Sequence, residues 1–299
     1  MFSNIKLSII IPVYNDPEGL RDTLSSMTDQ EGAPEYEVIV VDNDSTDSTP
    51  NVIEEFEQEY PDVVKGYSET KVQSSYAARN TGIKHANGDI TAFIDADVTV
   101  DQSWIAELYQ IFSTSDVDYL GCNIEMYISD GDETLWARYD KSVGLPVRHY
   151  LQTKRFAPTC ALAVSRSVFD EVGYFDESLI SGGDKEFGVR VSEAGYQLGY
   201  ADDLTVYHPT RNSLSDLVKK STRIGKGQTQ LWQKYGLSSH PLSLSKFLPP
   251  SPLRLQSRQS DSVPLYLLYP IEYGLKLIQS MESIKQYAAL LRSSVVGTD

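Results

Sequence analysis

The alternation of short apolar runs with amphipathic segments limits the folds open to this chain more than any other feature. Residues 7–13 (LSIIIPV), 36–42 (YEVIVVD) and 90–95 (ITAFID) are continuous and rich in β-branched side chains, as buried strands are. Between them, residues 17–29 and 75–89 carry apolar side chains at helical spacing. This alternation predicts βαβ units, and therefore an α/β fold with a mostly parallel sheet flanked by helices.

The predicted strands end in carboxylates. Asp42 closes the second run, and Asp95 and Asp97 stand one position apart at the end of the third. Such a pair is either a solvated strand end that leads into a helix cap, or a site for a divalent cation and the anion that it carries. Parallel sheets bind ligands at the carboxyl ends of their strands. Because Asp42 also lies at such an end, we favour the cation site.

The chain is strongly acidic, with a formal net charge of −16 over 299 residues. This length accommodates one large α/β domain with an appendage. The charge argues against nucleic acid as a partner, since a phosphate backbone is itself negative. It fits either a halophilic host, whose salt screens the self-repulsion, or an acidic enzyme of an ordinary host, and we favour the halophile.

Cysteine usage and apolar run lengths favour a cytoplasmic protein. Cys122 and Cys160 lack the spacing of metal ligands and cannot form a disulfide framework, so we expect buried free thiols. No run of about 20 apolar residues predicts a transmembrane helix. The first residues, MFSNIKLSIIIPVYN, lack a small-residue cleavage site and are interpreted as a core strand rather than a signal peptide.

The pattern divides the chain into an α/β domain, residues 1–212, and a helical C-terminal extension, residues 213–299. The extension contains a long helix at 213–236, a linker rich in Ser and Pro at 237–262, and a last helix at about 264–292. The other predicted elements are strands near 63–68, 119–128, 156–165 and 204–209, and helices near 101–112, 132–143 and 182–196.

Six motifs occur in one order between about residues 5 and 210: IIPVYN, VIVVDNDSTDST, AARNTGI, GDITAFIDADV, FDEVGYFDE and GGDKEF. In this order they resemble the family 2 glycosyltransferases of GT-A fold. The resemblance implies a GT-A-type nucleotide-diphospho-sugar transferase fold for the catalytic domain. It also implies an inverting, metal-dependent glycosyltransferase of hexosyltransferase type, which moves a sugar from a nucleotide-diphospho-sugar.

The acids and one histidine would hold a cation, Mg²⁺ or Mn²⁺. Departure of a nucleotide diphosphate leaves much negative charge, and hard divalent cations prefer carboxylate oxygens. The resemblance implies that Asp97 is the metal ligand and that Asp95 contacts the ribose or the water shell of the metal. It also implies that His208 completes the metal or diphosphate site, although a lone histidine is often structural.

The donor nucleotide would lie at the ends of the first two strands. By resemblance, Pro12, Tyr14 and Asp42 form the nucleoside pocket, with Tyr14 stacked on the base. Asp42 can accept the imide N–H of uracil, which favours a UDP-linked donor. Asn43 stands where the family commonly has a second acid. Arg79 either faces the donor diphosphate, as the resemblance implies, or is a surface arginine of its helix.

Asp184 matches the general base of the family. The acceptor hydroxyl must lose a proton as it attacks the anomeric carbon, and a carboxylate opposite the leaving group suits this task. Asp184 falls in the first turn of its predicted helix, where the macrodipole favours the ionised form. Alternatively, it is only a helix N-cap. Gly183 and Ala161 replace a glutamate and an asparagine that are usual in the family.

The C-terminal third bears on the acceptor. Lys219, Lys220, Arg223 and Lys226 form a basic stretch, which is either a solvated helix face or a patch for phosphate. The last helix either lies in a membrane interface or packs on the catalytic domain. The resemblance extends to archaeal enzymes that build dolichol-phosphate-linked glycans for protein N-glycosylation. It therefore implies a lipid-phosphate-linked glycan acceptor and peripheral contact with the cytoplasmic face of the cell membrane.

Three other functions were weighed against this one. A glycosyltransferase for extracellular polysaccharide would share the same motifs, but the Gln-x-x-Arg-Trp signature of processive members is absent. An inactive glycan-binding module would not need Asp97 and Asp184. A nucleotidyltransferase would carry a basic, Gly-rich loop after the first strand, and PVYNDPEGLRD offers none.

Overall fold

The computed structural model describes residues 5–251 and 264–296. Residues 1–4 and residues 252–262 of the predicted linker lie outside these ranges. The chain groups into two compact units, each of which we describe by itself. Unit 1 comprises Met1–Glu125, Leu145–Ser178 and Gly183–His208; unit 2 comprises Met126–Gly144, Leu179–Gly182 and Pro209–Asp299.

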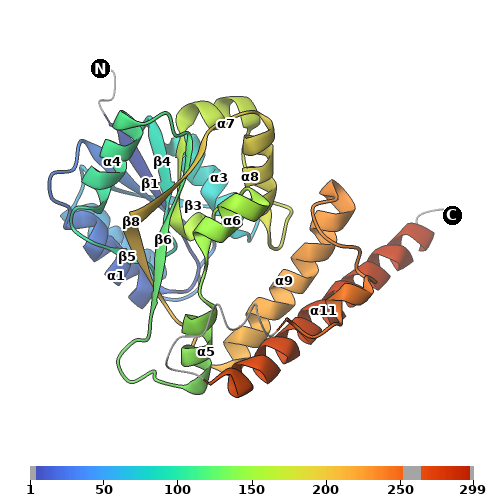
Figure 1. Ribbon diagram of the computed structural model, residues 1–299. Helices are drawn as coiled ribbons and strands as arrows, with labels where there is room; N and C mark the ends of the chain where they lie inside the picture. The colour runs from blue at the N-terminus through green and yellow to red at the C-terminus, as the bar shows by residue number, and fades with distance from the viewer. Residues whose placement is uncertain (1–4, 252–263, 297–299) are drawn as a thin grey trace. The chain divides into compact units, whose positions relative to one another are not determined.

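Unit 1 is built on an eight-stranded sheet with the strand order β3-β2-β1-β4-β7-β6-β8-β5 (Figure 1). Strands β3, β2, β1 and β4 are parallel to one another, whereas β7 pairs antiparallel with β4 and β6, and β8 with β5. The predicted α/β class is confirmed, and parallel pairing is confined to one half of the sheet. The strands are β1 (Leu7–Val13), β2 (Tyr36–Asp42), β3 (Val64–Ser68), β4 (Ile90–Phe93), β5 (Thr99–Val100), β6 (Tyr119–Tyr127), β7 (Leu162–Ser165) and β8 (Leu198–Pro209).

The two halves of the sheet differ in burial. Strands β1 and β2 are buried along almost their whole length, because helices cover both faces of a parallel sheet. Strands β6 and β8 mix buried with partly exposed positions, as antiparallel strands commonly do. This weaker apolar pattern explains why β8 begins at Leu198, earlier than the predicted 204.

Local backbone chemistry accounts for another difference from prediction. The strand predicted at 156–165 is wrong in its first part, where a 3₁₀ turn, Thr159–Ala161, precedes β7. Pro158 has no N–H to give to a neighbouring strand, which favours the turn. The sequence analysis also missed the two-residue strand β5 and the short helices α6 (Val147–Lys154) and α7 (Arg166–Val172).

Helices cover both faces of the sheet (Figure 1). Side chains of α1, α2 and α4 share one buried cluster with the strands. On the opposite face, α3 packs so tightly that a Cβ atom on Gly82 would lie 2.5 Å from Cγ2 of Ile10. The helices around the sheet, besides α6, are α1 (Pro17–Thr28), α2 (Thr49–Glu59), α3 (Ser75–His85), α4 (Trp104–Thr114), α7 (Arg166–Val172) and α8 (Gly183–Glu193).

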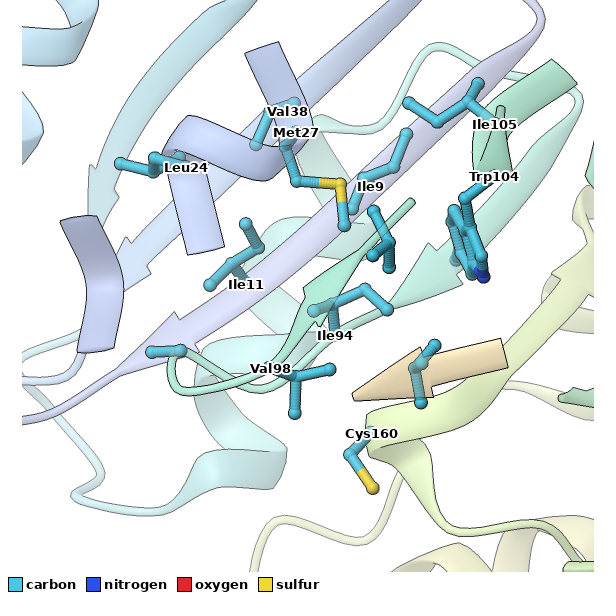
Figure 2. Close-up of a cluster of buried hydrophobic side chains, with 14 of the residues drawn as sticks. Ile9, Ile11, Leu24, Met27, Val38, Ile94, Val98, Trp104, Ile105 and Cys160 are labelled. Atoms are coloured by element: carbon cyan, nitrogen blue, oxygen red, sulfur yellow. The ribbon is translucent and has the colours of Figure 1, made fainter. Parts of the chain in front are cut away.

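The buried cluster follows from alternation along β1. Ile9 and Ile11 point to one face, where they meet Leu24 and Met27 of α1 and Trp104 of α4 (Figure 2). Burying one such side chain contributes about 1.5–3 kcal/mol. Helix α1 begins where Asp16 accepts a hydrogen bond from the N–H of Gly19 at 3.0 Å. The sequence therefore fixes both the helix start and the face that it buries.

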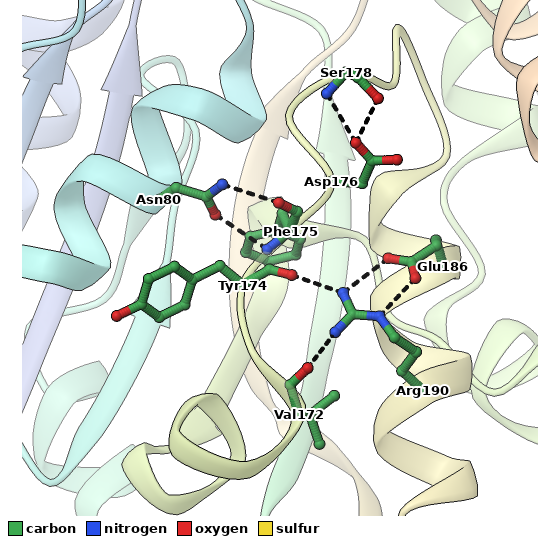
Figure 3. Close-up of polar contacts among 8 residues, drawn as sticks. All are labelled: Asn80, Val172, Tyr174, Phe175, Asp176, Ser178, Glu186 and Arg190. Atoms are coloured by element: carbon green, nitrogen blue, oxygen red, sulfur yellow. Dashed lines mark hydrogen bonds and ion pairs between the residues drawn. The ribbon is translucent and has the colours of Figure 1, made fainter. Parts of the chain in front are cut away.

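A polar network on the other face fixes the loop that leads to α8 (Figure 3). The side-chain amide of Asn80 accepts from the N–H of Phe175 at 3.1 Å and donates to its carbonyl at 2.9 Å. Arg190 of α8 pairs with Glu186 at 2.6 Å and donates to the carbonyls of Val172 and Tyr174. Helix α8 is thereby tied to the loop, which in turn is tied to α3, so the start of α8 has a defined place beside the sheet.

Unit 2 is mainly helical, with α5 (Leu135–Val143), α9 (Leu214–Tyr235) and α11 (Leu265–Val296). The helices predicted at 132–143, 213–236 and 264–292 are therefore confirmed. Helix α11 packs on α9 (Figure 1), and a Cβ atom on Gly225 would lie only 2.3 Å from the carbonyl oxygen of Gln279. The predicted linker is not wholly irregular, since a 3₁₀ turn spans Leu244–Lys246.

The packing answers part of the question about the last helix. Leu268 and Leu275 of α11 are buried with Leu217 of α9 and Tyr139 of α5. The apolar side of α11 therefore has a partner within unit 2. Within residues 5–251 and 264–296, we find no helix with the length and apolar character needed to cross a bilayer.

Candidate active site

The loops after β1 and β2 are joined by hydrogen bonds. Val13 is opposite Asp42 in the sheet register, so Tyr14 follows β1 beside the end of β2. Asn15 accepts from the N–H of Thr46 at 2.8 Å and donates its own N–H to Ser45 Oγ at 2.9 Å. Tyr14 is 49% exposed on this braced loop, whereas Asp42 is buried. An exposed ring next to a buried acceptor can stack on a base and recognise its edge.

Pro12 lies within β1 opposite Val41 of β2. On the other side of β1, the register with β4 ends at Ile10 and Phe93. The proline therefore falls beyond the last paired residue on that side, where its missing N–H interrupts no ladder. This arrangement brings Pro12 to the same strand end as Tyr14 and Asp42, as the resemblance implies for a nucleoside pocket.

Asn43 has a role that an acid could not fill. Its side-chain amide donates to the carbonyl of Glu69 at 2.8 Å and to that of Val72 at 2.9 Å. A carboxylate is an acceptor only and would face both carbonyl oxygens without a proton. The departure from the family pattern at this position therefore fixes the loop around Glu69–Val72 next to the predicted base pocket.

Three potential metal ligands converge from distant parts of the chain. One ligand atom each of Asp95, Cys160 and His208 lie within 4.8 Å of one another, with Cys160 and His208 buried. Ligands on opposite sides of one ion are about 4 Å apart, because metal–oxygen bonds measure about 2.1 Å. Asp95 and His208 offer an oxygen and a nitrogen donor that fit such an ion, whereas the thiol of Cys160, whose pKa burial raises, is a poor ligand for it.

Arg79 is not a surface arginine. It is only 4% exposed, and its Nη2 contacts Oδ1 of Asp95 at 2.5 Å. Its Nε atom is buried without a hydrogen-bond partner among the described residues. The surface interpretation is therefore wrong, and the helix α3 presents a cation directly to the acidic strand end. Contact of Arg79 with a donor diphosphate stays a prediction.

Electrostatics place Asp97 and Asp184 in the same neighbourhood. Burial raises the pKa of the Cys160 thiol, and the charges of Asp95, Asp97 and Asp184 raise it further, while Arg79 opposes them. All four charged groups therefore act on one buried sulfur atom. The three-ligand cluster contains Asp95 but not Asp97. The assignment of Asp97 as metal ligand stays a prediction.

The loop that carries Asp97 also lies against the start of α1. A Cβ atom on Gly19 would approach the carbonyl oxygen of Ala96 to 2.8 Å. Residue 19 must therefore be small for the acidic loop to pack where it does. Since Tyr14 immediately precedes this helix start, the same contact places the nucleoside-side loop and the acidic loop next to each other.

Asp184 lies in the first turn of α8, where Gly183 is constrained by a ring. The N–H of Gly183 donates to the hydroxyl of Tyr76 at 2.9 Å, and a Cβ atom at position 183 would lie 2.7 Å from that ring. This contact explains why the glutamate usual in the family is absent. Oδ1 of Asp184 accepts from the N–H of Lys185 at 3.0 Å.

Cys160 is the site residue that the sequence analysis missed. Its neighbours in the cluster are 65 and 48 positions away in sequence (160 − 95 and 208 − 160), so no motif spacing could announce it. The expectation that both cysteines are buried free thiols is confirmed. Only the fold distinguishes Cys160, in the turn before β7, from Cys122 within β6.

Sequence comparison decides the family. The model described as Glycosyl transferase family 2 matches residues 8–173, which is more than half of the chain. The chain belongs to glycosyl transferase family 2. It is 39% identical over 227 residues to glycosyltransferase AglE from Haloferax volcanii, covering 76% of this chain and 74% of that protein. The family of this glycosyltransferase is therefore the one that its six motifs indicated.

Two further similarities concern other members of the family. The glycosyltransferase is 25% identical over 241 residues to a dolichyl N-acetyl-α-D-glucosaminyl phosphate 3-β-D-2,3-diacetamido-2,3-dideoxy-β-D-glucuronosyltransferase from Methanococcus voltae, covering 76% and 74% of the two chains. Its fold resembles that of a Pyrobaculum calidifontis mannosyltransferase, solved in complex with GDP-Man and Mn²⁺. The TM-score is 0.59 at 19% identity, and the match covers 98% of this chain and 76% of the other. The predicted GT-A fold is therefore confirmed.

Proposed function

We propose that this glycosyltransferase inverts the anomeric centre as it moves a sugar from a UDP-linked donor to a lipid-phosphate-linked glycan. The observation that carries the proposal is the contact of Arg79 with Asp95, which has a ligand atom within 4.8 Å of ligand atoms of Cys160 and His208. A carboxylate, a guanidinium and an imidazole that meet after β4 suit a cation and a diphosphate, and the charges of Asp97 and Asp184 act on the same thiol. Ordinary strand ends do not need such a collection of charge.

Asp97 and His208 would hold a divalent cation, and Asp95 lies close enough to His208 to contact the same ion or its water shell. A bound cation would neutralise negative charge on the departing diphosphate. Carboxylate oxygens suit both Mg²⁺ and Mn²⁺, but an imidazole nitrogen in the ligand set favours the transition metal. We therefore propose Mn²⁺ over Mg²⁺. The 4.8 Å limit on the distances among the three ligand atoms supports a shared ion.

Tyr14 and Asp42 would bind the nucleoside. The exposed ring of Tyr14 offers a stacking surface, and the buried carboxylate of Asp42 can accept the imide N–H of uracil. Arg79 would contact an oxygen of the donor diphosphate while it pairs with Asp95. These roles favour UDP over donors with cytosine or adenine, because the ring nitrogen on the pairing edge of those bases carries no hydrogen to donate.

Asp184 would act as the general base. The acceptor hydroxyl attacks the anomeric carbon from the face opposite the diphosphate, so a new C–O bond forms as the old one breaks. The hydroxyl proton passes to the carboxylate of Asp184, and the nucleotide diphosphate departs with the bonding electrons. Attack on the opposite face inverts the configuration.

A labelled-donor assay tests the base. Asp184→Asn should lower the rate of transfer by at least about 10²-fold, since general-base catalysis contributes about 10²–10⁴-fold. Donor binding should persist. Glu193→Gln provides the matched control, because Glu193 is exposed on the same helix. Equal transfer rates in Asp184→Asn and wild type would remove Asp184 from the mechanism.

Chelation tests the cation independently of turnover. Removal of divalent metal should abolish protection of the protein by UDP against thermal unfolding, and Mn²⁺ should restore it. Asp97→Ala should weaken the Mn²⁺ effect further, whereas Asp29→Ala, at the end of α1, should not. Nucleotide binding that ignores both chelator and Asp97 would refute the metal site.

The proposed acceptor is supported by the dolichyl phosphate named for the Methanococcus voltae relative. Archaeal surface-protein N-glycosylation at the cytoplasmic face of the membrane is the corresponding pathway. A panel of polyprenyl-phosphate-linked and free oligosaccharides, offered with the labelled donor, distinguishes this acceptor from soluble polysaccharide. Transfer only to free oligosaccharide would contradict the lipid-linked assignment.

A further inference from the structure

Unit 2 contains a cavity of about 220 Å³ between α9, α11 and the segment that joins them. Two lysines, four serines and two glutamines line it, and none of its described lining residues is a carboxylate. The volume is several times the roughly 30 Å³ that one water molecule occupies in the liquid. In a chain with 42 acidic and 26 basic residues, such a lining is a local reversal of charge.

Lys246 is the unusual member of this lining. It is 7% exposed, and its Nζ donates to Ser283 Oγ at 3.0 Å. Among the described residues, no acid forms an ion pair with it. Burial lowers the pKa of Lys246. A buried ammonium group without a counter-ion is costly, and an anion in the cavity would reduce that cost.

Lys276 supplies a second ammonium group to the same cavity. Its Nζ donates to the carbonyls of Ser245 at 3.2 Å and Leu248 at 2.6 Å, which braces the segment. An ammonium group has three N–H donors. The described hydrogen bonds use one donor of Lys246 and two of Lys276, so three N–H donors remain for a ligand. The hydroxyls of Ser238 and Ser239, which also line the cavity, can add further donors.

The backbone beside Lys246 is also fixed. Ser280 Oγ donates to the carbonyl of Lys246 at 2.9 Å, and Thr229 donates to the carbonyl of Ser283 at 2.9 Å. Helices α9 and α11 are thus linked through the same polar layer that holds the lysine. The lysines and serines form a built pocket and not a chance meeting of flexible surface chains.

We propose that this pocket binds a phosphate group, either as a phospholipid headgroup or as free phosphate. Tetrahedral anions with several acceptor oxygens match convergent ammonium and hydroxyl donors. Leu242, Leu244 and Leu248 lie on the segment that carries Lys246 and are 53%, 81% and 61% exposed. Apolar side chains next to an anion pocket suit a headgroup that is attached to acyl or isoprenoid chains. Phosphate binding at this pocket does not depend on the proposed sugar transfer.

The full chain is titrated with inorganic phosphate by calorimetry, at constant ionic strength. Binding to Lys246→Met and to Lys276→Met should be at least about tenfold weaker than to wild type, because each change removes a charged donor. Lys285→Met is the matched control, since Lys285 is exposed on α11 and pairs with Glu282. Its binding should equal that of wild type.

A second arm separates the two sources of phosphate. Vesicles of neutral phosphatidylcholine are compared with vesicles that also contain phosphatidic acid, in a flotation assay. Binding to phosphatidic acid vesicles that requires both lysines assigns the pocket to a headgroup. Binding of inorganic phosphate without vesicle binding assigns it to the free ion.

The proposal is overturned if wild type, Lys246→Met and Lys276→Met bind equally in both arms, or if none of them binds in either arm. If Lys246→Met fails to fold, as judged by circular dichroism, Lys276→Met decides the question, because its lysine is at the rim and not buried.

Discussion

The strand-end site of unit 1 and the lysine pocket of unit 2 have opposite local charge. Around Cys160, three carboxylates and one guanidinium act on the same thiol. Around the pocket of unit 2, two lysines and four serines meet with no described carboxylate in the lining. The net charge of −16 conceals this contrast, because it averages over both places. Local imbalance, rather than total charge, indicates what each site can bind.

The two sites are also held in different ways. In unit 1, parallel strands bring Asp42 and Asp95 to one edge of a rigid sheet, on either side of β1. In unit 2, the pocket depends on how closely α9 approaches α11 at Gly225. A perturbation of either site should therefore leave the other unchanged, and the predictions below test this independence.

The largest effect is expected from Arg79→Gln. This change leaves Asp95, whose side chain is 35% exposed, without its cation beside other acids. Hydrogen bonds to charged groups contribute about 1.5–3 kcal/mol, and we expect a loss in this range. Urea unfolding without metal measures the loss. Mn²⁺ should restore part of it, because a ligand of the folded state stabilises that state. Phosphate binding by unit 2 should not change.

The control for that prediction is Arg21→Gln. Arg21 pairs with Glu55 at 2.6 Å, but both side chains are about half exposed. Exposed pairs contribute little to stability, because water screens both charges. If the two variants lose equal stability, the burial of Arg79 does not matter, and the interpretation of the acidic site fails.

The next effect is expected from Gly225→Ala in unit 2. The added Cβ would lie 2.3 Å from the carbonyl oxygen of Gln279, which lines the pocket, so the two helices must separate. Overpacking of this kind costs about 1–3 kcal/mol. Phosphate binding should fall, and stabilisation by Mn²⁺ should persist. Calorimetry with each ligand measures both, and loss of the Mn²⁺ effect would contradict independence.

Acid should weaken unit 2 through Asp140. Burial pushes the pKa of this carboxyl up, but Lys220 and Arg211 outweigh burial and leave it below its ordinary value of 3.8. A lowered pKa contributes stability that is present above pH 3.8 and lost as the pH falls through the folded-state pKa. The free energy of unfolding should therefore decrease below about pH 4. Asp140→Asn should remove this part of the slope, and an unchanged slope would contradict the assignment.

This pairing sharpens the contrast with Lys246. Two of the cations in or near the predicted basic stretch, Lys220 and Arg211, already have a carboxylate, and Lys219 pairs with Asp216. That observation favours the solvated or paired interpretation for this part of the stretch. Lys246, which forms no ion pair with an acid among the described residues, lies elsewhere, in what the sequence suggested was only a linker.

The smallest effect is expected from Gly274→Ala in α11. No heavy atom lies within 4 Å of the position that its Cβ would occupy. Alanine should stabilise the helix by about 0.5–1 kcal/mol, because glycine loses more backbone entropy there. Thermal unfolding measures the gain. A loss of stability comparable to that of Gly225→Ala would contradict the view that the cost of an added Cβ depends on how closely α9 approaches α11.

The sequence was sufficient for the parts of the fold that depend on local pattern. Continuous β-branched runs predicted β1 and β2, and with them that Tyr14 and Asp42 belong to neighbouring strand ends. Burial of Arg79 and the convergence of Cys160 on Asp95 could not be predicted in this way. Both depend on contacts between segments distant in sequence, which periodicity does not record.

The pocket of unit 2 shows that amino-acid composition, like periodicity, does not predict contacts between distant segments. Serine and proline between residues 237 and 262 predicted a linker. The composition of a segment predicts how exposed its residues are on average. A single lysine of that segment can still be buried by helices from other parts of the chain. Lys246 therefore became visible only when α9 and α11 were placed beside the segment.

The ring of Tyr76 lies against Gly183, so the residue types that fit at these two positions depend on each other. An acidic side chain fits at position 183 only if a smaller residue replaces Tyr76, since both cannot occupy the same space. Members of the family with glutamate at the position of Gly183 should accordingly carry a compact residue at the position of Tyr76. Neither change alone would be tolerated as well as the exchange of both.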